Sequence, residues 1–411
     1  MTDVVVIGAG VMGLCTALQL ARRAELSITV LDKGLGPGEG SSGASSAICR
    51  HLYSHDEMVA LARDGIEAYR NWAAFLESDD EPLAVFQAVG ALWLGHPGHL
   101  WQADTCERLA RFGVASRVID DTELRQRFPA INPCVKAPDF ATGEDHDCAG
   151  GATHLLETDA GFMDPVSVLQ DLVAALARRG VKVRFRTRVT RIECSGGRVK
   201  AAVCADGERI DAAWIVNASG PWCNALLGEL QLAQQWPLQP TRIQMVHLER
   251  PAAVVGDIPV CVDMLSGIYF RPQNRGQQLI LGSTLEEDEQ EVVSDPDHFD
   301  TLSDEDFRLL KLHALHHRLP ALPYAGQLRG YAGLYTVNQA DMHPVVGASP
   351  VDGFVVVNGF SGHGFKLAPA IGSLLAQHIT GTRMNGDTDV PIDFLAWGRD
   401  PLPLETKNVL A

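Results

Sequence analysis

Residues 4–32 constrain the fold of this chain more than any other stretch. Residues 4–7 form a short apolar run, which is typical of a strand buried in a parallel sheet. Apolar residues then recur at helical spacing through Ala21, and a second apolar run, residues 28–31, ends at Asp32. Between the first run and the helical pattern, three glycines stand at G-x-G-x-x-G spacing: Gly8, Gly10 and Gly13. The pattern predicts a complete βαβ unit.

The glycines and the terminal acid predict that this unit binds a dinucleotide. The first glycine permits a tight turn, the second lets the backbone approach a pyrophosphate, and the third lets helix and strand pack closely. The helix N-terminus offers free N–H groups and the positive end of its dipole to the phosphates. Asp32 stands where a carboxylate accepts the ribose hydroxyls. The alternative is a glycine-rich turn in an ordinary α/β domain, but strand, helix, second strand and acid together favour the dinucleotide.

Composition argues against several other classes of protein. A formal net charge of −17 argues against nucleic acid or an anionic membrane surface as a partner. No apolar run approaches the roughly 20 residues that span a bilayer, and no signal peptide precedes the first strand, so we expect a cytoplasmic protein. The nine cysteines form no C-x-x-C pair and no Cys/His cluster of ligand spacing, so we expect free thiols and no metal site.

The remainder of the chain alternates between two kinds of segment. At 411 residues the chain is long enough for two domains rather than one. Nucleotide-type strand and helix patterns recur at residues 165–185 and 354–379, and β-rich, irregular segments lie between them, as at residues 240–325. This interleaving predicts two domains between which the chain passes more than once.

Several motifs together carry a resemblance to one family. They are, in chain order, residues 6–13 (VIGAGVMG), 161–165 (GFMDP), 216–222 (VNASGPW), 267–270 (GIYF), 341–347 (DMHPVVG) and 359–369 (GFSGHGFKLAP). In order and spacing they resemble the FAD-dependent D-amino-acid-oxidase-like flavoenzymes, near sarcosine oxidase and glycine oxidase. The resemblance covers essentially the whole chain.

The resemblance implies an α/β protein, α+β overall, with a Rossmann-like FAD-binding domain and a substrate domain built on a mainly antiparallel sheet. The flavin ring is expected at the junction of the two. Combined with the alternating pattern, this predicts the following ranges: residues 1–82, 150–226 and 327–411 for the FAD-binding domain, and residues 83–149 and 227–326 for the substrate domain.

The resemblance also implies which residues hold the FAD. They are Gly8, Gly10, Gly13, Asp32, Ser42, Val189, Ala218, Gly220, Gly333, Gly362, His363, Gly364 and Lys366. The loop of residues 359–364 offers backbone N–H groups ahead of a helix, which suits the side of a reduced flavin where negative charge develops. Gly333 stands where some sarcosine oxidases carry a cysteine bonded to the flavin, so we expect FAD to be held non-covalently.

The resemblance also implies which residues bind the substrate. Arg50 and Lys366 match positions that bind the substrate carboxylate in sarcosine-oxidase-like members, and a guanidinium fork with a second point charge suits that anion. For Arg50 alone the alternative is a structural salt bridge. Tyr269 and Tyr335 match positions that border the substrate, where the alternative is ordinary half-buried packing. We therefore assign these four residues to catalysis.

Two further points bear on the chemistry. His51 and His363 flank these motifs, and a structural imidazole is as good an interpretation for each as a proton-transfer role. Ile280 stands where oxidases of the family place a lysine that helps oxygen accept the first electron, and an apolar side chain supplies no such charge. We therefore expect a quinone, a dye or a partner protein to be a better electron acceptor than oxygen.

The function implied is oxidation of the C–N bond of an amino acid, with a secondary, N-methyl or D-configured amine as substrate. A hydride moves from the carbon to flavin N5, and the imine is then hydrolysed. One alternative keeps the fold but oxidises a 2-hydroxy acid. Another is a flavoprotein subunit that is active only within a hetero-oligomeric dehydrogenase.

Overall fold

The computed structural model describes residues 2–96, 101–143, 147–323 and 328–404. A mainly parallel sheet is built around the predicted βαβ unit. Its path runs through β17 (Val345–Ala348), β18 (Phe354–Asn358), β11 (Arg209–Asn217), β1 (Thr2–Ile7), β2 (Ile28–Leu31) and β8 (Lys182–Arg184). An antiparallel extension leaves this path at β11, through β10 (Arg198–Cys204) and β9 (Val189–Ser195).

The strand β1 is apolar without alternation because both of its faces are covered. Val4 and Val6 pack into the cluster formed with the helices, whereas Val5 and Ile7 pack into a cluster with residues of β9, β10 and α7 (Cys223–Glu229). Successive side chains of a strand point to opposite faces, so a strand buried on both faces reads as one apolar run. This confirms the interpretation of residues 4–7 as a buried parallel strand.

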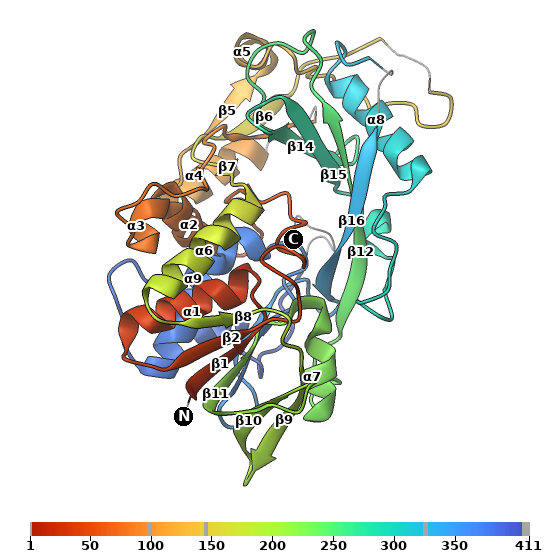
Figure 1. Cartoon of the computed structure of the whole chain (residues 1–411). Helices are drawn as coiled ribbons and strands as arrows, with labels where there is room; N and C mark the ends of the chain where they lie inside the picture. Colours follow the sequence, from red (N-terminus) through yellow and green to blue (C-terminus); the bar gives the residue numbers. More distant parts are fainter. Residues whose placement is uncertain (1, 97–100, 144–146, 324–327, 405–411) are drawn as a thin grey trace.

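Helices of the first sheet pack on one face of it (Figure 1). They are α1 (Val11–Arg23), α2 (Asp56–Arg70), α3 (Trp72–Leu76), α6 (Pro165–Arg178) and α9 (Gly364–Thr380). The close approach of α1 and α9 depends on Gly372, where a Cβ would lie 2.9 Å from the carbonyl carbon of Cys15. The helix α6 begins where the motif predicts, because the Asp164 side chain accepts the N–H of Ser167 at 2.8 Å and Pro165 occupies the first turn.

A second sheet is mainly antiparallel and runs from β5 and β6 near the top of Figure 1 to β16 and β12 on its right side. Its order is β16 (Arg329–Asn338), β12 (Leu238–Glu249), β15 (Gln278–Ser283), β14 (Ile268–Gln273), β13 (Val260–Asp263), β4 (Ala91–Trp93), β6 (Thr153–Glu157) and β5 (Ser116–Asp120). The helices near it are α4 (Trp101–Arg111), α5 (Asp121–Arg127) and α8 (Glu305–Arg318), and α8 packs on β12, β14 and β15.

Short elements complete the connections between the sheets. They are β3 (Ile48–Cys49) paired with β7 (Gly161–Phe162), and the 3-10 helices η1 (Gly220–Trp222), η2 (Glu286–Glu289) and η3 (Ile392–Leu395). The mixed α/β fold with several sheets confirms the predicted fold class.

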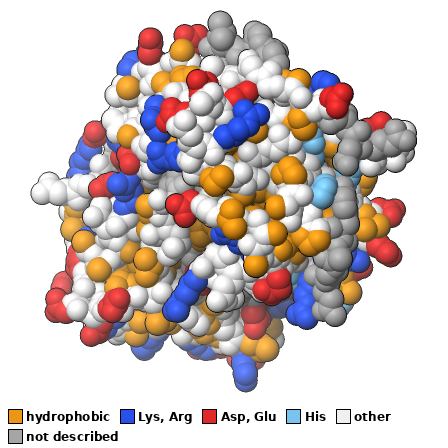
Figure 2. Space-filling model, turned by 90° about the horizontal axis from the view of Figure 1, so that it is seen from above, with side chains coloured by type: hydrophobic (Ala, Val, Ile, Leu, Met, Phe, Trp, Pro, Cys, Tyr) orange, Lys and Arg blue, Asp and Glu red, His pale blue; other side chains and the backbone are white. Residues whose placement is uncertain are grey.

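Acidic and basic side chains are interspersed over the face seen in Figure 2. Among the described residues, no helix has the length and apolarity needed to cross a bilayer.

The predicted domain boundaries stay a prediction. Two strands of the second sheet fall within ranges that the sequence assigns to the FAD-binding domain. β6 falls within residues 150–226, and β16 falls within residues 327–411. The reason is that each strand completes its hydrogen bonds with strands of the substrate sheet, β6 with β4 and β5 and β16 with β12. The chain therefore returns from the second sheet to the first only after β6 and after β16, later than the predicted boundaries at residues 150 and 327.

Candidate cofactor and substrate cavities

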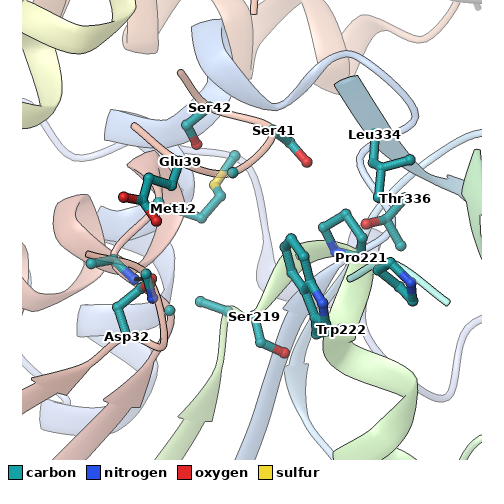
Figure 3. Close-up of a pocket in the computed structure, with 18 of the residues that line it drawn as sticks. Met12, Asp32, Glu39, Ser41, Ser42, Ser219, Pro221, Trp222, Leu334 and Thr336 are labelled. Atoms are coloured by element: carbon teal, nitrogen blue, oxygen red, sulfur yellow. Dashed lines mark hydrogen bonds between the residues drawn. The ribbon is translucent and has the colours of Figure 1, made fainter. Parts of the chain in front are cut away.

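A cavity of about 490 Å³ lies at the carboxyl ends of the central parallel strands. In open α/β sheets, ligands bind at this edge. Figure 3 shows Met12 and Asp32 on one side of this space, facing Pro221 and Trp222 on the other, with the loop that carries Ser42 above them. The cavity also reaches β16 of the second sheet, so both sheets contribute to its walls.

The glycine turn after β1 has no room for side chains. Gly8 has a φ of 108°, and a Cβ there would lie 2.3 Å from the carbonyl oxygen of Ala218. A Cβ at Gly13 would lie 2.0 Å from the carbonyl oxygen of Gly8. The N-cap residue of α1, Gly10, has no side chain to cap the helix. The first turn of α1 therefore faces the cavity with its backbone, as binding of a pyrophosphate requires.

Two side chains organise this turn. The Asp32 carboxylate accepts the N–H of Ala9 through Oδ2 at 2.6 Å and the N–H of Gly34 through Oδ1 at 2.7 Å. The Ser42 hydroxyl accepts the N–H of Val11 at 3.0 Å. Asp32 thus joins the ends of β1 and β2 and presents its carboxylate to the cavity, where a ribose hydroxyl could donate to it.

Most of the residues predicted to hold FAD line this cavity. They are Gly8, Gly10, Asp32, Ser42, Val189, Ala218, Gly220, Gly333, Gly362 and Gly364. Gly13 does not line the cavity but packs closely against the carbonyl oxygen of Gly8 in the turn. His363 is buried beneath the loop, with its ring centroid 5.3 Å from that of Tyr53, and is not among the described lining residues. Lys366 borders a different cavity. The residue types and their arrangement fit an FAD, and Gly333 offers no side chain for a bond to the flavin.

A second cavity of about 40 Å³ adjoins the first, with which it shares Ser45, Tyr335, Gly362 and Phe365. The four residues predicted for catalysis all line it: Arg50, Lys366, Tyr269 and Tyr335. They come from the end of β3, the first turn of α9, β14 and β16, which are far apart in the sequence. The tertiary fold therefore brings two cations and two phenol rings to one small space beside the cofactor cavity.

Arg50 is buried and held by neighbouring rings and backbone. Only 3% of the residue is exposed, and Nη1 donates to the carbonyl oxygen of Leu52. Its guanidinium carbon lies 4.3 Å from the ring centroid of Tyr53 and 5.5 Å from that of Trp93. These contacts fix the guanidinium plane while the side chain still borders the small cavity.

Lys366 is equally buried, and its position depends on α2. Burial, and then the positive charge of Arg50, hold the pKa of Lys366 well below its ordinary value. The Tyr69 hydroxyl donates to the carbonyl oxygen of Phe365 at 2.8 Å, and the two rings stack. The site therefore contains a lysine whose ammonium form is disfavoured until an anion enters.

Glu157 is a site residue that the sequence analysis missed. Its Oε2 lies 2.6 Å from the backbone N and 2.9 Å from Nδ1 of His51, and its Oε1 accepts the indole N–H of Trp93 at 2.7 Å. Burial alone would raise the pKa of Glu157, but the hydrogen bonds and charge of His51 lower it below its ordinary value. Glu157 is thus a buried negative charge near Arg50 and Lys366. No motif marks it, because its partner is 106 residues away.

Tyr269 and Ile280 show how β14 and β15 shape the small cavity. The Tyr269 ring lies over Gly282, where a Cβ would come within 2.5 Å of the phenol oxygen. Ile280 is buried with Tyr269 in one apolar cluster and is not among the described residues that line either cavity. Opposite it in the strand register stands Arg271, whose Nε donates to the carbonyl oxygen of Ser46 at 2.7 Å. Burial lowers the pKa of Arg271 to about 10.

The fold and these cavities define a flavoprotein class in which a Rossmann-like sheet holds the dinucleotide and a second sheet borders a cationic pocket. The family model described as FAD dependent oxidoreductase (DAO) matches residues 3–378. The chain belongs to this family. The match confirms the predictions of FAD as cofactor and of an FAD-dependent oxidoreductase resembling the D-amino-acid-oxidase-like enzymes.

Individual proteins are similar over nearly the whole chain. The monomeric sarcosine oxidase of Streptomyces avermitilis is 27% identical over 394 residues, which cover 92% of this chain and 94% of that protein. The FAD-dependent oxidoreductase domain-containing protein 1 of Bos taurus is 26% identical over 414 residues, 92% of this chain and 81% of that protein. The crystal structure of L-proline dehydrogenase from P. horikoshii matches the fold with a TM-score of 0.81, 21% identity and 96% coverage of both chains.

Proposed function

We propose that this protein is an FAD-dependent amino acid dehydrogenase or oxidase that oxidises the C–N bond of a small amino acid, either a secondary or N-methyl amine or a D-amino acid. Similar proteins include a sarcosine oxidase, an L-proline dehydrogenase and a glycine oxidase, the last from Bacillus cereus with a TM-score of 0.76 and 18% identity. These names suggest a small amino acid, and the residues of the small cavity support the same substrate class.

The observation that carries the proposal is the pair Arg50 and Lys366. Both are buried at the small cavity, which would be costly for two like charges unless an anion enters between them. A substrate carboxylate supplies that anion, and a guanidinium binds it through two parallel hydrogen bonds. Glu157 offsets part of the charge without lining the cavity, so it leaves the two cations available to the substrate.

The position of this pair orients the rest of the substrate. With its carboxylate at Arg50 and Lys366, the α-carbon points toward the boundary that the small cavity shares with the cofactor cavity at Tyr335 and Gly362. Bound FAD would supply a two-electron acceptor there. Holding the reacting carbon in one geometry removes much of the entropic barrier to transfer.

The same two charges favour the reactive form of the amine. Hydride loss from the α-carbon needs the nitrogen lone pair, so the substrate amine must be neutral. Cations near an ammonium group lower its pKa, and Arg50 and Lys366 are such cations. The site therefore assists deprotonation by its charge, and the proposal assigns no proton transfer to His51 or His363.

The size of the cavity limits the substrate. The space of about 40 Å³ is small and shares part of its lining with the cofactor cavity, so it favours a substrate with few side-chain atoms. Tyr269, Val262 and Ile48 border this space and would contact the substituents. Sarcosine, glycine and proline are the substrates to test first, with D-alanine and larger N-methyl amino acids as a size series.

Anaerobic reduction of the bound flavin tests the proposal. The holoprotein is mixed with each amino acid and with the matching 2-hydroxy acid, and bleaching of the flavin absorbance is followed with time. We expect amines to bleach the flavin and the hydroxy acids to leave it oxidised. Bleaching by hydroxy acids alone would replace the proposal with 2-hydroxy acid oxidation. No bleaching by any compound would favour a subunit that needs a partner chain.

A further inference from the structure

One of the loops that connect elements of the second sheet lines part of the cofactor cavity. Residues 294–301, here called the clasp, run between η2 and α8. Just before the clasp, the N–H of Val293 donates to the carbonyl oxygen of Pro240 in β12 at 2.8 Å. At its end, the carbonyl oxygen of Thr301 accepts the N–H of Ala332 in β16 at 2.7 Å. Both ends are therefore tied to the substrate sheet, whereas Pro296, Asp297, Phe299 and Thr301 line the cofactor cavity.

The middle of the clasp is tied to the other sheet through one carboxylate. Asp297 pairs with the ammonium of Lys33, and its Oδ2 lies 2.9 Å from Nη2 of Arg188. Its Oδ1 accepts the indole N–H of Trp222 at 2.9 Å. Lys33 also lies over the Trp222 ring, 3.8 Å from its centroid. Lys33, Arg188 and Trp222 themselves line the cavity, so this cluster joins opposite walls across it.

The charges in this cluster support a persistent contact. Partial burial would raise the pKa of Asp297, but its hydrogen bonds to Lys33 and Arg188 lower it to about 2. The carboxylate is therefore ionised throughout the neutral range. A single exposed ion pair contributes little to stability, but here two cations and an indole donor converge on one carboxylate, and a cation–π contact joins two of them.

The clasp crosses the cavity at its adenosine end. Lys33 directly follows Asp32, the residue placed to accept ribose hydroxyls, and Arg188 directly precedes Val189 of the cavity wall. The N–H of Thr187 donates to the carbonyl oxygen of Asp32 at 2.7 Å, which fixes Arg188 beside this end. A dinucleotide bound with its ribose at Asp32 would lie between the clasp and the parallel sheet.

We propose that residues 294–301 are a part of the FAD site that opens to admit and release the cofactor, with Asp297 as the latch to Lys33, Arg188 and Trp222. The clasp is tied to the substrate sheet, so a bound FAD would contact elements of both sheets. This inference needs only that the protein binds FAD. It does not depend on which substrate is oxidised.

The release of FAD from the holoprotein tests the latch. Asp297→Asn keeps the shape of the side chain and removes its charge. Because the substitution removes the charge that ties the clasp to Lys33 and Arg188, it favours the open form of the clasp, and we expect FAD to leave at least ~10-fold faster, measured by the rise of free-flavin fluorescence after dilution. Uptake of FAD by the apoprotein should be no slower, because an unlatched clasp opens more readily.

A matched control separates the latch from a general loss of surface charge. Asp352 pairs with Arg198 in an exposed ion pair, and neither residue lines the cofactor cavity. Asp352→Asn should release FAD at the wild-type rate. Lys33→Gln should speed release as well, and the Lys33→Gln/Asp297→Asn double variant should release less fast than the product of the two single effects.

Two results would overturn the inference. One is release of FAD from Asp297→Asn at the wild-type rate. The other is release of FAD from Asp352→Asn that is accelerated as much as release from Asp297→Asn. Slower uptake of FAD by Asp297→Asn would show that Asp297 is a simple contact of the cofactor and not a latch. None of these measurements requires turnover. The inference about the clasp can therefore be contradicted while the proposed amino acid oxidation stands, and amino acid oxidation can be contradicted while the inference about the clasp stands.

Discussion

Gly65 in α2 lies against the carbonyl oxygen of Lys366 in the first turn of α9, so closely that a Cβ at residue 65 would be 2.1 Å from that oxygen. The same two helices are joined nearby by the hydrogen bond that the Tyr69 hydroxyl donates to the carbonyl oxygen of Phe365. The position of Lys366 at the small cavity is therefore set by the packing of α2 on α9 as well as by its own helix.

We predict that Gly65→Ala weakens carboxylate binding more than it lowers the flavin content. The added methyl group must push α9 away from α2, which costs about 1–3 kcal/mol of stability for an overpacked site. The lysine then moves relative to Arg50. Apparent affinity for substrate and flavin content of the purified protein measure the two effects. The control is Gly228→Ala, since Gly228 is helical and a Cβ there meets no atom within 4 Å.

Arg50→Gln and Lys366→Met should each weaken binding of the substrate or of a carboxylate inhibitor. Loss of one charge-assisted hydrogen bond costs on the order of 1.5–3 kcal/mol, or roughly 10- to 150-fold in affinity. The flavin content should stay normal, because neither side chain lines the larger cavity. Inhibitor titrations of the flavin spectrum give the affinities. Unchanged affinity in both variants would remove the pair from the substrate site.

Binding of a carboxylate should become weaker as the pH rises. In the free site, burial and the charge of Arg50 hold the pKa of Lys366 well below its ordinary value, so the lysine loses its proton early. An entering carboxylate favours the ammonium form, raises the pKa again and draws in a proton. Affinity for acetate, which has no amine to titrate, should therefore fall above the free-site pKa. A pH series checks this, and Lys366→Met should flatten the dependence.

FAD should leave the protein completely on denaturation. Gly333 lies in the wall of the cofactor cavity and has no side chain that could bond to the flavin, and a Cβ there would already lie 2.8 Å from Cβ of Ala44. Acid precipitation should release all of the yellow colour into the supernatant. Flavin that remains in the washed pellet would contradict non-covalent binding.

Reduced protein should react more slowly with oxygen than with a quinone-like dye. A positive charge beside the flavin stabilises superoxide as it forms, and Ile280 supplies none. Stopped-flow reoxidation of substrate-reduced protein compares the two acceptors. Ile280→Lys should speed the reaction with oxygen, whereas the volume-conserving Ile280→Leu should not. Fast reoxidation of the wild type by oxygen would mean that Lys366 or the buried Arg271 provides the charge.

The βαβ unit, the cofactor class and four residues of the small cavity could all be predicted from the sequence. Gly8, Gly10 and Gly13 are fixed by local geometry, since a turn, a helix start and a close approach all fall within a few residues. Arg50 and Lys366 could be identified because each matches a position that binds the substrate carboxylate in the family that the sequence resembles. Spacing along the chain is enough wherever the interacting groups are near neighbours in the sequence.

The distant side chains that complete the site could be identified only from the folded structure. Glu157 reaches His51 across 106 residues, Asp297 meets Lys33 across 264, and Gly65 meets the backbone of Lys366. The same holds for β6 and β16, which join the second sheet from segments that the sequence assigns to the first domain. Periodicity and motif spacing report local conformation, whereas these contacts arise when whole sheets and helices pack, and no local pattern encodes the partner.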